Sequence, residues 1–327
     1  MSDETSFLTP EVTSMPRFSG IRTFMRLPYE PEVQERDFVV LGAPFDTSAS
    51  YRAGTRFGPE GIRRISSLLR PANVFHKIKP SEFLNGVDGG DIMVIPGNTE
   101  ASHRNITAHV KAWAEKGAVP IVLGGDHSIT LPELRALSSV HGPLSLLHFD
   151  AHGDTWDDYW GEKYTHGTPF RRAVEEGLID PYRSVQIGMR GTVYHPNDLD
   201  EARKLGFLVI TADEMREIGL QETMRRALER IGESKVFLTF DIDFLDPAFA
   251  PGTGTPEIAG FTSAEAQGML RQLTDIHLVG CDLVEVLPAL DSAEITTLTG
   301  ATLVFEFLSL LAVHKQRTTS SSFSHSK

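Results

Sequence analysis

The stretch LSLLHFDAHGD, residues 144–154, joins an apolar run to a cluster of acids and histidines. Its first part, Leu144–Phe149, lacks the alternation of a half-buried strand and therefore predicts a strand buried on both faces of a parallel sheet. Its second part places Asp150, His152 and Asp154 at alternate positions, which project to one side of an extended backbone. In an open parallel sheet, ligands bind just beyond the carboxyl ends of such strands.

Seven further apolar segments have the same character and alternate with segments of helical pattern. This repeated strand–helix alternation predicts a three-layer α/β/α sandwich with a mostly parallel eight-stranded sheet and right-handed crossovers. The additional predicted strands are Phe38–Leu41, Gly86–Val87, Val119–Leu123, Ser184–Ile187, Phe207–Ile210, Lys235–Phe240 and Leu278–Val284.

Three helix signals stand out between and after these strands. Thr130 with Glu133, and Thr262 with Glu265, each have the spacing of a capping box, in which two side chains satisfy free N–H groups at a helix start. Leu303–Val313 is apolar nearly all round, which predicts a buried helix near the end of the chain.

The domain organisation predicted from composition has three parts. Residues 1–35 mix proline, threonine, serine and charge and are expected to form an irregular arm, followed by one α/β/α domain over residues 36–315. Residues 316–327 are polar and rich in serine and threonine, which predicts a disordered tail. No targeting signal and no apolar stretch of the roughly 18 residues that a membrane span needs is found, so we expect a cytoplasmic protein that does not enter a membrane.

Charge and cysteine content exclude several classes of function. The formal net charge is −13, which leaves no basic excess to neutralise a nucleic-acid backbone, so we expect no nucleic-acid partner. Cys281 is the single cysteine of the chain, so neither an intrachain disulfide nor a cysteine-based zinc cage is possible.

Acids and histidines also follow three other predicted strands. Asp241 and Asp243 come after the predicted strand Lys235–Phe240. His127 comes after Val119–Leu123, and Glu285 comes after Leu278–Val284. Each group taken alone is also compatible with solvated loop charges. Five carboxylates gathered at one edge would repel one another strongly without cations, so together they favour a metal site. Carboxylates with a minority of imidazoles suit Mn²⁺-like ions, and two bridging carboxylates can hold two ions close together.

These motifs resemble the three signatures of the ureohydrolases, the arginase/agmatinase family. The matching stretches are GGDHS at 124–128, FDAHGDT at 149–155 and FDIDFLDP at 240–247. The agmatinase branch is favoured over the arginases by GIRTFMRLP at 20–28, YTHGTPFRR at 164–172 and PGTGTPE at 251–257.

The resemblance implies a ligand set, two catalytic side chains and a reaction. One metal would be held by His127, Asp150, Asp154 and Asp241, and the other by Asp150, His152, Asp241 and Asp243. His166 would be the proton shuttle, and Glu285 would hold the substrate guanidinium. The family usually uses two Mn²⁺ ions, with Ni²⁺ in a minority, and often assembles as homotrimers or homohexamers. The expected reaction hydrolyses a small guanidino compound, agmatine first, to an amine and urea.

Several substrates of the branch are compatible with the sequence. Gly153 and the segment Val286–Asp291 depart from the usual agmatinase pattern, and guanidinobutyrate, guanidinopropionate, proclavaminate-type substrates and guanidine itself stay open. The residues predicted to contact the substrate tail form one loop, whose carboxylates and aromatic rings suit the cationic end of agmatine. They are Trp156, Asp157, Asp158, Tyr159 and Trp160. Arg52 or Arg190 could instead bind a carboxylate tail. A catalytically silent subunit and a metal-dependent deacetylase are the alternative functions.

Overall fold

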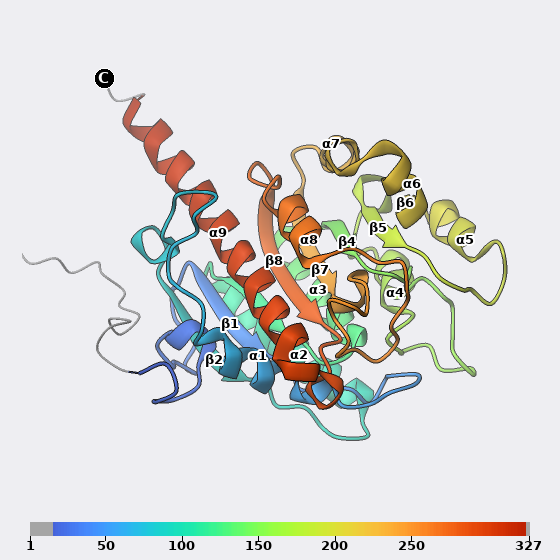
Figure 1. Ribbon diagram of the computed structural model, residues 1–327, viewed down its shortest axis with the longest axis horizontal. Coiled ribbons are helices and arrows are strands. Elements are labelled where there is room, and N and C mark those ends of the chain that lie inside the picture. The colour runs from blue at the N-terminus through green and yellow to red at the C-terminus, as the bar shows by residue number, and fades with distance from the viewer. Residues whose placement is uncertain (1–15, 325–327) are drawn as a thin grey trace, which may run out of the picture.

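The computed structural model describes residues 16–324, and its central feature is one eight-stranded sheet in which all strands are parallel (Figure 1). The strand order is β2-β1-β3-β8-β7-β4-β5-β6. Every predicted strand is present, which confirms the predicted sheet. The strands are β1 (Phe38–Gly42), β2 (Gly86–Asp91), β3 (Val119–Leu123), β4 (Ser145–Phe149), β5 (Val185–Met189), β6 (Leu208–Thr211), β7 (Lys235–Asp241) and β8 (His277–Val284).

Helices cover both faces of the sheet, as the absence of alternation in the strands predicted. One apolar core lies under α1, α6, α7, α8 and α9, and the second lies under α2, α3, α4 and α5. The three-layer α/β/α architecture is thereby confirmed. The helices are α1 (Gly58–Ser66), α2 (Thr99–Glu115), α3 (Thr130–His141), α4 (Pro169–Glu175), α5 (Asp198–Leu205), α6 (Ala212–Ile218), α7 (Leu220–Ile231), α8 (Ser263–Leu270) and α9 (Ile295–Ser324).

The part of the predicted N-terminal arm that the structure describes is anchored to the sheet. It is irregular apart from a short 3-10 turn, Phe24–Arg26, while residues 1–15 of the arm lie outside the described residues. Phe24 is buried, and its N–H donates to a carboxylate oxygen of Asp88 in β2 at 2.7 Å. Asp88 also receives two hydrogen bonds from the buried guanidinium of Arg63 in α1. A buried ion pair thus ties the arm, the sheet edge and α1 together.

Helix α9 is longer than the sequence predicted. Its buried part contains Leu303–Val313 as expected, but the helix continues to Ser324, so residues 316–324 are helical where a disordered tail was predicted. The Thr319 hydroxyl donates to the Lys315 carbonyl, and Arg317 forms an ion pair with Asp275, contacts that composition does not reveal. Residues 325–327 lie outside the described part of the chain.

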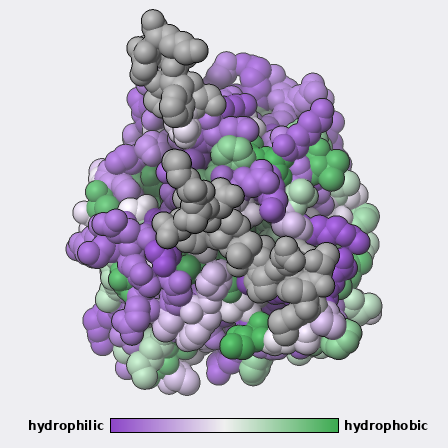
Figure 2. Space-filling model, turned by 90° about the vertical axis from the view of Figure 1, so that its left-hand side faces the viewer, coloured by the Kyte–Doolittle hydropathy of each residue, from purple (hydrophilic) through white to green (hydrophobic). Residues whose placement is uncertain are grey.

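The length and apolar composition of α9 would also allow it to cross a membrane. In the fold, however, 78% of that apolar window is buried inside the protein, so packing against the sheet accounts for it. On the face of the molecule drawn in Figure 2, hydrophilic residues predominate and the apolar ones lie in small separate groups.

One of the two predicted capping boxes is present. The Thr262 side chain and the Glu265 side chain exchange hydrogen bonds at the start of α8, as expected. The box predicted for Thr130 and Glu133 is wrong, because α3 continues directly from a 3-10 turn, His127–Ile129, and has no side-chain cap. Both side chains instead point into the protein interior, where they are fully buried.

Candidate metal centre

The motif residues meet at the carboxyl edge of the sheet because their strands are neighbours. Strands β3, β8, β7 and β4 are adjacent in that order. The chain leaves β3 towards His127, β4 towards Asp150, and β8 towards Glu285, while β7 ends at Asp241. Parallel strands end at the same edge, so residues up to 158 positions apart in sequence become neighbours, as when the His127 N–H donates to a Glu285 carboxylate oxygen at 2.9 Å.

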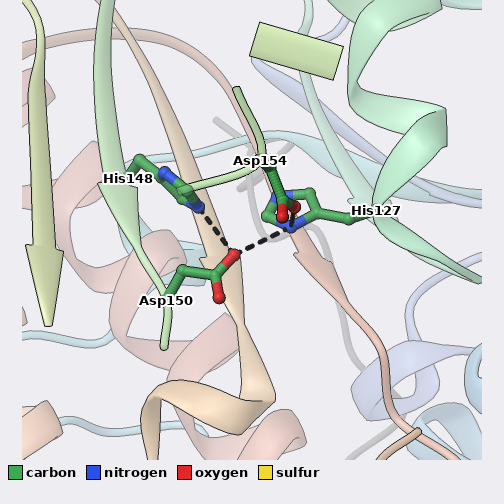
Figure 3. Close-up of side chains that lie close together, drawn as sticks. All are labelled: His127, His148, Asp150 and Asp154. Carbon is green, nitrogen blue, oxygen red and sulfur yellow. Dashed lines mark hydrogen bonds and ion pairs between the residues drawn. The ribbon is translucent and has the colours of Figure 1, made fainter. Parts of the chain in front are cut away.

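The first group of side chains gathers around the ring of His127. Its Nδ1 lies 3.1 Å from Asp150 Oδ2, 3.0 Å from Asp154 Oδ2 and 3.3 Å from Asp241 Oδ2, and all four side chains are buried. Figure 3 shows Asp150 and Asp154 directed towards this ring from the segment that follows β4. Three carboxylate oxygens around one ring nitrogen form the kind of pocket that a divalent cation fills.

A second group shares Asp150 with the first. His152 Nδ1 lies 3.4 Å from Asp150 Oδ1 and 3.2 Å from Asp243 Oδ2. Asp150 therefore turns one oxygen towards His127 and the other towards His152. Asp154 adopts a positive φ of 49°, a strained conformation for a residue with a side chain, and such strain concentrates at functional sites.

The electrostatics of the cluster are unfavourable without positive charge. Burial, followed by the charges of Asp243 and Asp150, raises the pKa of Asp241 well above its usual range. Burial also raises the pKa of Asp243 to about 6, although the charge of His152 opposes this. Asp243 Oδ2 and His127 Nδ1 are buried without an aligned hydrogen bond. Cations would satisfy these atoms and stabilise the carboxylates, so the residues present fit a pair of divalent ions.

His148, which lies inside the predicted strand Leu144–Phe149 and was not predicted as a site residue, contacts this group directly. It is fully buried, and its Nε2 lies 2.7 Å from Asp150 Oδ2 (Figure 3). Its Nδ1 lies 3.1 Å from the amide nitrogen of Gln186. The sequence feature that could have identified His148 was its position two residues before Asp150, because alternate residues of a strand place their side chains on the same side. Its contacts hold the Asp150 carboxylate in orientation.

Asp126 and Asp246, which lie inside the first and third signature motifs, hold loops in place. Asp126 accepts hydrogen bonds from the N–H groups of Ser128 and Ser48 and so fixes the turn that carries His127. Asp246 accepts from the N–H groups of Ala248 and Gly260 and closes the loop that follows the β7 motif.

His166 and Glu285 form a buried pair beside the cluster. His166 Nδ1 lies 2.9 Å from Glu285 Oε1, and its Nε2 lies 2.6 Å from the hydroxyl of Ser50. Burial disfavours the imidazolium, but the hydrogen bond and charge of Glu285, with Asp154 and Asp126, outweigh burial and raise the pKa of His166 to about 9. Glu285 itself has a positive φ of 63°, so its backbone is held in a strained conformation.

A cavity of about 700 Å³ opens onto His166 and onto part of the metal cluster, whereas Glu285 does not line it. Its floor includes His152, Asp154, Asp241 and His166, which were all predicted as site residues. Its wall comes from the loops after β1, β4, β5 and β7, and includes Arg52, Trp156, Tyr159, Trp160, Tyr194 and Glu257. Neither Tyr194 nor Glu257 was predicted as a site residue. Tyr194 lies outside the quoted motifs, and Glu257 ends the stretch PGTGTPE, whose place beside the cavity follows only from the fold.

Two of the five predicted tail-binding residues do not face the cavity. Asp157 forms an ion pair with Arg172 at 2.7 Å, and Asp158 accepts a hydrogen bond from the Gly161 N–H. Arg190, one of two arginines considered for a carboxylate tail, donates to backbone carbonyls that include those of Asp243 and Glu257. Its guanidinium therefore braces loops and is not available to a ligand.

Comparison with known proteins shows what the chain is similar to. The sequence model of the arginase family matches residues 36–309. A guanidinopropionase of Pseudomonas aeruginosa is 46% identical, the match covering 92% of this chain and 95% of that protein. A mitochondrial agmatinase of Gallus gallus is 44% identical, over 92% and 89% of the two chains. The solved structure of a proclavaminate amidinohydrolase from Streptomyces clavuligerus has a TM-score of 0.89 at 42% identity, over 92% of this chain and 100% of that one.

Proposed function

Because this chain belongs to the arginase family, we propose that it is a binuclear-metal amidinohydrolase that cleaves a guanidino compound to an amine and urea. The observation that carries the proposal is the position of Asp150, which turns one carboxylate oxygen to His127 and the other to His152. A carboxylate shared between two histidine-containing groups is the arrangement that holds two cations close together in hydrolytic sites.

The proposed ligands divide into two overlapping sets. One ion would be held by His127, Asp150, Asp154 and Asp241, and the other by Asp150, His152, Asp241 and Asp243. We propose Mn²⁺ for both positions, with Ni²⁺ as the alternative, because carboxylates outnumber imidazoles in each set. When bound, two such cations lower the pKa of a shared water towards neutrality and supply hydroxide at neutral pH.

Glu285 is proposed to hold the guanidinium through its second oxygen. Its Oε1 is occupied by the His127 N–H and by His166 Nδ1. Oε2 has no hydrogen bond to the described part of the protein, so it is the oxygen left for a planar cation. A carboxylate that is already held by two donors loses little conformational freedom on binding, and it can orient the guanidinium carbon for attack.

His166 is proposed to move the proton that the leaving amine requires. It lies in the cavity floor, with Glu285 on one ring nitrogen and the Ser50 hydroxyl on the other. The bound cationic substrate and metal ions would oppose its protonation, which brings its raised pKa back towards neutrality, where a histidine can both accept and release a proton.

Agmatine is proposed as the first substrate to test. Trp156, Tyr159 and Trp160 line the cavity and offer faces for cation–π contact with an ammonium group, and Glu257 adds a negative charge to the same wall. The expected support from Asp157 and Asp158 is absent because neither residue lines the cavity. Arg52 places a positive charge on the wall and favours a guanidino acid, such as the substrate named for the Pseudomonas relative.

The experiment is a urea-release assay on the purified chain loaded with Mn²⁺ or Ni²⁺. The panel contains agmatine, guanidinobutyrate, guanidinopropionate, arginine and guanidine. Urea from at least one compound supports the proposal, and comparison of agmatine with the guanidino acids gives the preferred tail charge. No urea from any compound, with two ions bound, would instead favour the catalytically silent subunit. The predicted homotrimer or homohexamer, the cytoplasmic location and the lack of nucleic-acid and membrane partners stay predictions.

His166→Ala provides a test of the proton-transfer role within the same assay. We expect kcat to fall about 10²- to 10⁴-fold, the usual contribution of a general acid or base, with both ions still bound. Loss of an ion from this variant would show that His166 is a ligand, contrary to the proposed role.

A further inference from the structure

We propose that Glu257 selects substrates whose tail ends in a positive charge, because it offers the substrate tail a carboxylate that has no partner in the protein. This inference rests on the proposed function and adds to it a residue that determines specificity. Glu257 lies between β7 and α8, in the wall of the cavity.

The segment that carries Glu257 begins beside the oxygen proposed to hold the guanidinium. A Cβ added at Gly254 would lie 3.6 Å from Glu285 Oε2 and 3.1 Å from the carbonyl oxygen of Arg52, so the glycine leaves space next to Oε2. The next three residues, up to Glu257, all line the cavity. Three residues of extended chain span at most about 11 Å, and the six bonds of about 1.5 Å between the guanidinium carbon and the ammonium nitrogen of agmatine span about 7 Å. A guanidinium held at Oε2 therefore has a tail long enough to reach the part of the wall that carries Glu257.

The Glu257 side chain is held in place without being neutralised. Its main-chain carbonyl accepts a hydrogen bond from Arg190 Nη2 at 2.8 Å, which fixes this part of the loop. Its side chain covers Gly191, where an added Cβ would lie 2.2 Å from the Glu257 carboxyl carbon. Gly191 begins the loop after β5 that also lines the cavity, so the carboxylate lies where two wall loops meet. A group held in this way loses little conformational freedom when a ligand binds.

No ion pair or hydrogen bond to another described side chain satisfies this carboxylate. The guanidinium of Arg190, whose charge acts on Glu257, donates only to backbone carbonyls. The Glu257 side chain is also half-buried, so it is less hydrated than a carboxylate on the open surface. A cation that binds here gains a charge-assisted hydrogen bond and displaces little from the carboxylate.

Arg52 is the other charged residue of the wall, and its surroundings make it the weaker determinant. Its side chain is exposed, and its guanidinium lies over the ring of Tyr51, 5.2 Å from the ring centre. Water and salt screen an exposed charge more strongly than a half-buried one. The Glu257 carboxylate therefore discriminates between substrate tails more strongly than the Arg52 guanidinium does.

The test measures kcat/KM for urea release from agmatine and from guanidinobutyrate by the Mn²⁺-loaded full chain, because these compounds are similar in length and end in opposite charges. The wild type should prefer agmatine. Glu257→Gln keeps the size of the side chain but removes its charge, and should lower kcat/KM for agmatine about 10- to 100-fold, the range for one charge-assisted hydrogen bond, without lowering that for guanidinobutyrate. Glu257→Lys should reverse the preference. Glu217→Gln, which changes an exposed glutamate of α6, is the control and should keep the wild-type ratio.

Calorimetric titration with two amines gives a measurement that does not depend on turnover. 1,4-Diaminobutane and 1-aminobutane differ by one ammonium group, so the wild type should bind the diamine about 10- to 100-fold more tightly, and Glu257→Gln should bind both alike. Circular dichroism and bound Mn²⁺ report folding, and Glu257→Ala replaces Glu257→Gln if the latter does not fold.

Two results would overturn this inference and leave the proposed function intact. One is a wild type that prefers guanidinobutyrate, and the other is an unchanged ratio of kcat/KM in a folded variant without the carboxylate. A wild type that binds two ions but releases no urea from any guanidino compound would overturn the proposed function, and with it the role of Glu257.

Discussion

Replacing His166 with alanine should change how the stability of the metal-stripped protein depends on pH. The pKa of His166 is raised from 6.5 to about 9, chiefly by Glu285 acting against burial. A raised pKa means that the folded state binds the proton more tightly than the unfolded state does. The stabilisation is fully present below pH 6.5 and is lost as the pH rises through 9. At about 1.4 kcal/mol per pKa unit, the difference between 6.5 and about 9 corresponds to about 3 kcal/mol.

The assay is urea unfolding of the wild type and His166→Ala between pH 6 and pH 9.5 in the presence of a chelator. The difference between their free energies of unfolding should shrink by about 3 kcal/mol across this range. His195→Ala, which changes an exposed histidine outside the pair, is the matched control and should keep the pH dependence of the wild type. If the two free energies of unfolding of wild type and His166→Ala run parallel over the whole range, the Glu285–His166 pair does not hold the proton as the geometry indicates.

Three further predictions concern the cluster, the core and one loop. Asp241→Ala should abolish urea release and remove bound metal, measured by elemental analysis; full activity would refute its proposed place between the ions. Arg63→Ala should lower the free energy of unfolding by about 3 to 5 kcal/mol, measured by denaturant titration, because it leaves the buried Asp88 carboxylate without its partner. Gly125→Ala should fail to accumulate as folded protein, measured by soluble yield and circular dichroism, because its new Cβ would lie 1.7 Å from the Phe45 carbonyl oxygen; a wild-type yield would contradict this.

The sheet could be predicted from the sequence because its strands are buried on both faces. Runs such as Val119–Leu123 carry no polar residue to obscure the pattern, and the predicted and observed bounds of that strand agree. The convergence of the motifs followed from a general property of parallel sheets, whose carboxyl ends share one edge. No knowledge of the strand order was needed to bring Asp150 and Asp241 together.

Features that depend on neighbouring segments were not predictable in this way. Asp157 was expected in the cavity, but a nearby arginine, Arg172, holds it outside. Thr130 had the spacing of a capping residue, yet its hydroxyl donates to Asp282 on another strand. The role of His148 was hidden because an apolar strand explains a buried histidine equally well. For Asp157 and Thr130 the outcome is set by a partner on another element of the fold, and the local sequence pattern carries no information about that partner.

The central claim is that the described acids and histidines hold two cations that share Asp150, and anomalous scattering tests it most directly. A crystal of the full chain grown with Mn²⁺ and measured near the manganese absorption edge should show two peaks, one beside His127 Nδ1 and one beside His152 Nδ1, with the Asp150 carboxylate between them. A single peak, or none at a saturating concentration of Mn²⁺, would contradict the account.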